Sequence, residues 1–303
     1  MNTGLKHSGV VVPMVTPVTE DGRLDEPAMD RLVDFLVAGG VDGIFVMGTT
    51  GEGTAIPHDY RQHLVERTVA RVKGRVKVFA GIGDAHPGEI VAGNAYFCAG
   101  VDAVVSRPPV AIPVGELLPW FRALLDGLDG PLLLYNMPMT TKISIPLDVV
   151  ENLMGHPRLA GMKDSENNPK RLEELLRRFG GNQNFSVFVG VGALMEGGLR
   201  LGADGIVPSV GNLIPEVCRD LCVAARKGDW TGAWALHSRM SAVAALYQNG
   251  RTLNESLSVL KSALHLRGIC APHVLPPLKP LTESQMKKLR NEMERLHLLN
   301  GQP

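Results

Sequence analysis

The sequence has no excess of charge of either sign. Among 303 residues, 31 Lys and Arg side chains balance 31 Asp and Glu side chains, and the formal net charge is zero. Such a chain has no long-range field that attracts nucleic-acid phosphates or anionic lipids, and no run of Lys or Arg resembles a nucleic-acid-binding arm. We therefore expect no nucleic-acid partner.

Long hydrophobic runs are also missing. The longest apolar stretches, such as 9–14 and 131–135, have the length of a strand, whereas a membrane-spanning helix needs about 20 apolar residues. The N-terminal segment 1–8 leads directly into the first of these stretches and lacks the apolar core and cleavage site of a signal peptide. These features predict a cytoplasmic protein without a membrane span.

Metal-ligating residues are few. The four cysteines are Cys98, Cys218, Cys222 and Cys270, and no second pair joins Cys218 and Cys222 to complete a zinc site, so buried thiols are expected. Of nine histidines, only His86 falls near the end of a predicted strand. A catalytic metal would need two or three converging ligands, so we expect no metal ion and no other cofactor.

The sequence does contain a regular alternation of short β-branched runs with amphipathic stretches of helical length. This alternation is typical of parallel strands joined by crossover helices. In the first helical stretch, apolar side chains from Met29 to Val37 share one face, behind Asp25 as the expected N-cap. The eight strand-like runs are Val10–Met14, Gly43–Met47, Val76–Gly81, Ala103–Ser106, Pro131–Asn136, Leu159–Lys163, Phe185–Gly190 and Gly205–Pro208.

Eight βα units in about 220 residues favour an α/β fold of the (β/α)8 TIM-barrel type over an open doubly wound sheet. Beyond Gly228 no strand pattern follows. Helices are expected at Trp230–Tyr247 and Asn254–Leu266, and Thr282–Gln285 resembles a capping box that opens a last helix. We therefore predict a catalytic barrel, residues 1–227, and a C-terminal helical extension, residues 228–303.

In such barrels the active site lies at the carboxyl ends of the strands. Lys163 ends the sixth predicted strand, where its side chain would enter the apolar barrel mouth. Burial favours the neutral amine, which is a nucleophile for carbonyl carbon. The alternative is a solvated lysine just past the strand.

Two further strand ends carry polar groups. Tyr135 ends the neighbouring fifth strand, so its phenol is expected near Lys163, where it would transfer a proton; otherwise it is a strand-end tyrosine that covers the core. The turn Gly48–Gly51 offers backbone N–H groups and the hydroxyls of Thr49 and Thr50 to a small carboxylate.

Together these residues resemble the dihydrodipicolinate synthase / N-acetylneuraminate lyase family of class I, Schiff-base-forming aldolases and lyases, over about residues 8–297. The most specific feature is the segment Gly161–Ser165, with its lysine 28 residues after Tyr135. The other matching segments are Val15–Pro17, Gly48–Glu52, Tyr135–Pro138 and Gly202–Ile206.

The resemblance implies a role for each of these residues. Lys163 would form an imine with pyruvate or another 2-oxo acid, Tyr135 would transfer protons, and the threonine turn would hold the substrate carboxylate. The candidate substrate-binding residues are Gly48, Thr49, Thr50, Thr140, Ile206 and Ser209. The resemblance also implies a homotetramer, a dimer of dimers.

Three segments depart from the family pattern. Ser106–Val110 replaces the aromatic segment whose tyrosine completes a proton relay in the synthases, and Thr140 falls near the position of their carboxylate-binding arginine. Gly190–Gly192 replaces the acidic residues with which sialic acid lyases bind sugar hydroxyls. Opposite the 2-oxo acid, polar contacts would have to come from Arg107, Lys142 or Ser209.

These patterns predict an enzyme that cleaves a 4-hydroxy-2-oxo acid into a pyruvate-like 2-oxo acid and an aldehyde. The same imine chemistry also supports a 2-oxo acid dehydratase or deaminase, or a dihydrodipicolinate synthase. An alternative from a different functional class is a non-catalytic barrel that binds a 2-oxo acid as a regulator.

Overall fold

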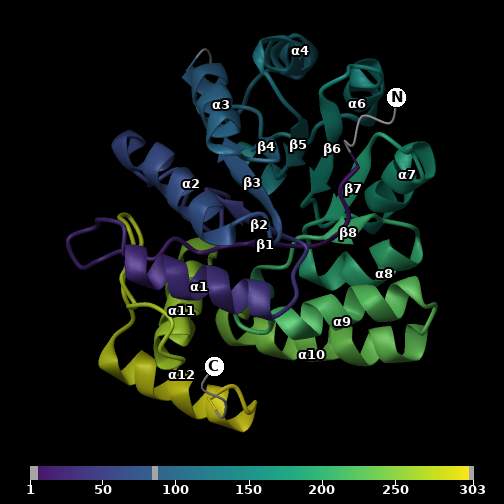
Figure 1. Ribbon diagram of the computed structural model, residues 1–303. Coiled ribbons are helices and arrows are strands. Elements are labelled where there is room, and N and C mark those ends of the chain that lie inside the picture. Colours follow the sequence, from purple (N-terminus) through teal and green to yellow (C-terminus); the bar gives the residue numbers. More distant parts are fainter. Residues whose placement is uncertain (1–5, 84–87, 300–303) are drawn as a thin grey trace.

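Eight parallel strands close into a barrel at the centre of the molecule. The computed structural model describes residues 6–83 and 88–299, in which each strand pairs with the next and β1 pairs with β8 (Figure 1). The predicted (β/α)8 fold is confirmed, with strand limits within two residues of those expected. The strands are β1 Gly9–Pro13, β2 Gly43–Val46, β3 Lys77–Ile82, β4 Ala103–Ser106, β5 Leu132–Asn136, β6 Leu159–Asp164, β7 Ser186–Val189 and β8 Gly205–Ile206.

Helices surround this barrel, and local signals explain where they begin. The Asp25 side chain accepts a hydrogen bond from the Ala28 N–H and caps α1 as predicted, while Leu32 and Leu36 bury the inner face of that helix. The surrounding helices are α1 Glu26–Ala38, α2 His58–Val72, α3 Gly88–Ala99, α4 Leu117–Gly127, α5 Pro138–Thr141, α6 Leu147–Leu153, α7 Pro169–Phe179, α8 Met195–Arg200 and α9 Pro215–Arg226.

Strand alternation separates two cores. Ile44 and Val46 face the helices, whereas Phe45 between them belongs to a smaller cluster inside the barrel. Phe79 and Phe188 meet edge to face in that cluster, with ring centroids 6.5 Å apart. Because these rings fill the interior, polar side chains have open space only at the strand ends.

Three helices form the C-terminal extension: α10 Trp230–Gln248, α11 Leu253–Leu266 and α12 Glu283–Arg295. Helix α10 lies beside α9, and α12 begins at the predicted capping box of Thr282 and Gln285 (Figure 1). The extension reaches the barrel mouth, where the Ser209 and Tyr247 hydroxyls lie 2.8 Å apart. No helix within the described ranges is long and apolar enough to cross a bilayer.

Three of the four cysteines are buried, as predicted. Burial raises the pKa of Cys222 and of Cys270 to about 12 and that of Cys218 well above its ordinary value. The prediction was wrong for Cys98, which is exposed because it lies on the outer side of α3.

Candidate active site

Lys163 and Tyr135 lie side by side at the carboxyl ends of neighbouring strands. They are register partners in β5 and β6. The Lys163 Nζ atom is 3.9 Å from the centroid of the Tyr135 ring and 5.2 Å from that of Phe45. Lys163 is 6% exposed and Tyr135 is 4% exposed. The lysine therefore lies within the barrel mouth rather than in solvent, and aromatic faces border its amine.

The phenol of Tyr135 lies in a polar setting. Its oxygen is 3.2 Å from the Thr49 Oγ1 atom. Burial acts to raise the pKa of Tyr135, but the charge of Lys163 and hydrogen bonds with Thr49, Lys163 and Ser165 outweigh burial and hold this pKa below its ordinary value. A phenol with a lowered pKa transfers its proton more readily near neutral pH.

A glycine leaves the space that the Lys163 side chain occupies. A Cβ atom at Gly190, after β7, would lie 2.0 Å from the Ser165 Oγ atom and 3.1 Å from the Lys163 Cε atom. The Gly190 N–H also donates to the Asp164 carbonyl over 2.7 Å. Close packing thus requires glycine at this position.

A charged network fixes the ends of β5 and β6 behind the lysine. The buried Asp164 carboxylate accepts hydrogen bonds from Asn136 Nδ2 at 3.0 Å, Arg171 Nε at 2.8 Å and the Glu166 N–H at 2.9 Å. Glu166 Oε2 in turn accepts from Asn136 Nδ2 and from Ser144 Oγ. These bonds hold the two strand ends at one spacing, and so hold Lys163 beside Tyr135.

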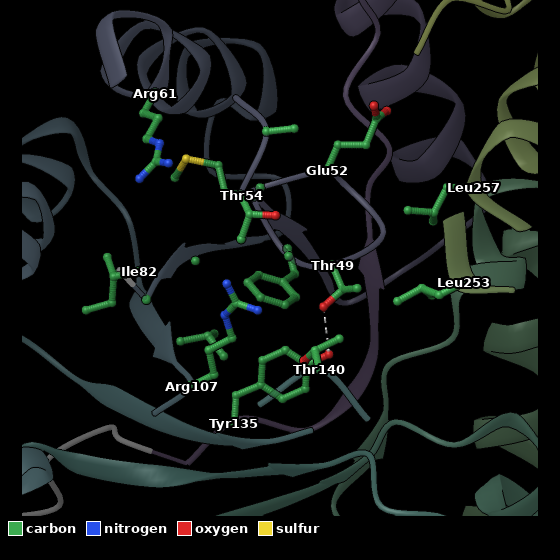
Figure 2. A pocket seen from close by; sticks show the side chains of 18 of the residues that line it. Thr49, Glu52, Thr54, Arg61, Ile82, Arg107, Tyr135, Thr140, Leu253 and Leu257 are labelled. Carbon is green, nitrogen blue, oxygen red and sulfur yellow. Dashed lines mark hydrogen bonds between the residues drawn. The ribbon is translucent and has the colours of Figure 1, made fainter. Parts of the chain in front are cut away.

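Two cavities open at the strand ends and share Thr49 and Tyr135. We call the larger one, of about 510 Å³, the lysine cavity, because Lys163, Ser165 and Glu166 line it. The smaller one, of about 270 Å³, is the arginine cavity, which Arg61 and Arg107 line (Figure 2).

The structure divides the predicted binding residues between these cavities. Thr50 and Ser209 line the lysine cavity, whereas Gly48 and Thr140 line the arginine cavity. The side chain of Ile206, a predicted binding residue, lines neither cavity. It is fully buried between the barrel and the helices, because strand alternation turns the next side chain, that of Val207, into the barrel instead.

Sequence reasoning missed several residues of the lysine cavity. Tyr247 and Arg251 come from the C-terminal extension, and no local motif marked them. Glu166 directly follows the segment Gly161–Ser165, and this position next to Lys163 was the one feature of the sequence that could have indicated its place in the cavity. No group of three His, Cys, Asp or Glu side chains that would hold a metal ion occurs in residues 6–83 and 88–299, and His86 lies outside them.

Comparisons with known proteins identify the family of this chain. The sequence model of the Dihydrodipicolinate synthetase family matches residues 6–296. Over 96% of its length the chain is 29% identical to a 4-hydroxy-tetrahydrodipicolinate synthase of Methanosarcina mazei, covering 99% of that protein. Over 96% of its length it is also 30% identical to the putative 2-dehydro-3-deoxy-D-gluconate aldolase YagE of Escherichia coli, covering 97% of that protein.

Two solved structures show the same fold. The dihydrodipicolinate synthase of Bacteroides thetaiotaomicron superposes with a TM-score of 0.91 at 33% identity, over 97% of this chain and 100% of that one. Escherichia coli YagE, solved in complex with pyruvate, gives a TM-score of 0.89 at 29% identity, over 96% of this chain and 99% of that one. The chain therefore belongs to the dihydrodipicolinate synthetase family and is an enzyme of its class I, Schiff-base-forming lyases and synthases.

Proposed function

We propose that this enzyme cleaves a 4-hydroxy-2-oxo acid into pyruvate, or a close relative, and an aldehyde. One observation carries the proposal: the buried Lys163 amine lies 3.9 Å from the Tyr135 ring, inside a cavity of about 510 Å³. The pyruvate in the YagE structure and the aldolase name of that relative support a 2-oxo acid substrate.

Lys163 would begin the reaction by attacking the C2 carbonyl carbon of the substrate. The adduct then loses its hydroxyl group as water, with the proton of the Tyr135 phenol, which gives a protonated imine between C2 and Nζ and leaves Tyr135 as the phenolate. The turn that carries Thr49 and Thr50 would hold the C1 carboxylate through hydroxyl and backbone N–H groups. The imine is an electron sink beside C3.

Tyr135 would then take the proton of the C4 hydroxyl as the C3–C4 bond breaks. The electron pair of that bond passes to the imine and forms an enamine, while C4 leaves as the aldehyde carbonyl. Protonation of the enamine at C3 and hydrolysis of the imine release pyruvate and restore the lysine. Tyr135 suits this role because burial, which raises its pKa, is outweighed by the charge of Lys163 and the hydrogen bond with Thr49, so that its pKa lies below the ordinary value.

Dihydrodipicolinate synthesis is a second candidate, which the names of several relatives favour. It would use the same imine of Lys163 with pyruvate. The segment Arg107–Pro109 weighs against it, because neither proline offers the phenol that completes the relay of the synthases.

We also propose that the enzyme forms a homotetramer and that its chain divides into a barrel, residues 1–227, and an extension, residues 228–303. Val110, Val114 and Met139 are exposed by 62%, 55% and 63% near the barrel mouth, which supports a contact with a second copy.

Borohydride reduction in the presence of pyruvate tests the imine. We expect intact mass to increase by one reduced pyruvyl group and peptide mapping to place it on Lys163. An adduct on Lys142, or no adduct, would refute the proposal. A panel of 2-oxo acids, assayed for released aldehyde, then separates cleavage from dehydration.

A further inference from the structure

Arg107 directly follows Ser106, the last residue of β4, and its side chain points into the arginine cavity. Figure 2 shows the guanidinium between the side chains of Thr54 and Tyr135. Within residues 6–83 and 88–299, no hydrogen bond or ion pair engages this guanidinium. A cation that is partly withdrawn from water without a partner favours an anionic ligand.

The other charged groups of the cavity have partners within the protein. Glu52 accepts a hydrogen bond from Lys261 Nζ and another from the Leu275 N–H, each over 2.7 Å. Arg61 donates through Nε to the Ile56 carbonyl. The Glu52 carboxylate is thus already neutralised, so no carboxylate that lines this cavity among the described residues is free to pair with Arg107.

The position of Arg107 relative to Lys163 follows from the barrel. Ser106 of β4 pairs with Leu134 of β5, and Tyr135 of β5 pairs with Lys163 of β6. Two strand spacings, about 10 Å, therefore separate the strands that carry the two cations. Tyr135 lies between them and borders both cavities.

This arrangement gives a direction to the bound substrate. In the proposed mechanism C2 is joined to Lys163 and the C4 hydroxyl meets Tyr135. Because Tyr135 lines both cavities, the carbons after C4 have a path past its phenol into the arginine cavity. Thr140 lines this cavity but offers only a hydroxyl. Arg107 supplies a cation to the same cavity from a different strand.

We propose that Arg107 binds a carboxylate at the far end of the substrate, so that the enzyme prefers 4-hydroxy-2-oxo acids with a second, terminal carboxylate. The inference rests on the proposed function. A guanidinium presents two parallel N–H donors, which match the two oxygens of a carboxylate.

The test compares three substrates of equal carbon chain length, ending in a carboxylate, a primary amide or a phosphate ester. We expect wild type to prefer the carboxylate by about 10- to 100-fold in kcat/KM. In Arg107→Leu that preference should vanish, mainly through a higher KM. Arg107→Lys should retain part of this preference, because an ammonium group keeps the positive charge but lacks the two parallel N–H donors of a guanidinium.

Arg290→Leu, which removes an exposed arginine on α12, is the matched control and should behave as wild type. Trapping of pyruvate on Lys163 should be equal in all variants, because Arg107 takes no part in forming the imine. A wild-type enzyme that fails to trap pyruvate would refute the proposed function rather than the role of Arg107. Equal rates for carboxylate and amide, faster turnover of the phosphate ester, or a full carboxylate preference in Arg107→Leu would overturn the inference. If Arg107→Leu is insoluble, Arg107→Lys takes its place in the test. An undiminished preference of Arg107→Lys for the carboxylate substrate would then overturn the inference.

Discussion

The Lys261 Nζ atom lies 2.7 Å from the Glu52 Oε1 atom, and both side chains are 1% exposed. Glu52 belongs to the loop that follows Thr49 and Thr50, whereas Lys261 belongs to α11 of the extension. The pair therefore joins the extension to the turn that is proposed to hold the substrate carboxylate.

We expect Lys261→Met to destabilise the protein by about 3–5 kcal/mol, because it leaves the Glu52 carboxylate buried without its counter-charge. Adding Glu52→Gln should recover part of this loss in the free energy of unfolding. Chemical denaturation of both single variants and the double variant measures the coupling. Additive losses would show that the two side chains act independently.

Tyr135→Phe should keep most of the borohydride trapping and lose turnover by about two to four orders of magnitude, as for a missing general acid–base group. The phenylalanine preserves the ring beside Lys163 and removes only the hydroxyl. Steady-state rates and trapping on the same preparation measure both effects. Unchanged turnover would remove the phenol from the mechanism.

The lowered pKa of Tyr135 predicts an ionisation on the basic side of the pH profile, below the ordinary tyrosine pKa of 10.0. Because folding favours the ionised phenol, this group adds stability at pH values above the unfolded pKa. The contribution is lost as the pH falls through the folded pKa. Tyrosinate absorbance should rise at lower pH in wild type than in Tyr135→Phe; identical titrations would contradict this.

Synthesis of dihydrodipicolinate from pyruvate and aspartate semialdehyde should be too slow to be useful. Pro108 and Pro109 cannot supply the phenol relay of the synthases, and a carboxylate-binding arginine beside them does not replace that phenol in proton transfer. A coupled assay with Lys163→Ala as the blank measures this rate. Robust synthesis in wild type, absent from that variant, would show that these substitutions matter less than we infer.

Removal of residues 228–303 should give aggregated protein. The lost α10 buries Met240, Val243 and Leu246, and its removal would leave apolar partner surface open to water. Size-exclusion chromatography of the truncated chain checks this expectation, and a soluble, active monomer would show that the extension is dispensable.

Sequence by itself determined the barrel, because apolar periodicity reports locally which face of each strand or helix is buried. It also determined that Tyr135 and Lys163 meet, since consecutive strands of a closed parallel barrel are neighbours. It predicted the caps of α1 and α12 from side chains within three residues of each helix start.

Only the tertiary structure decided which strand-end residues share a cavity. Ile206 shows the limit: strand alternation turned its side chain away from the mouth, and the exact strand register was needed to see this. Glu52 and Lys261 are 209 residues apart in the chain, so no local pattern could pair them. Side-chain partners at such separations depend on how whole helices pack, and packing is a property of the complete fold.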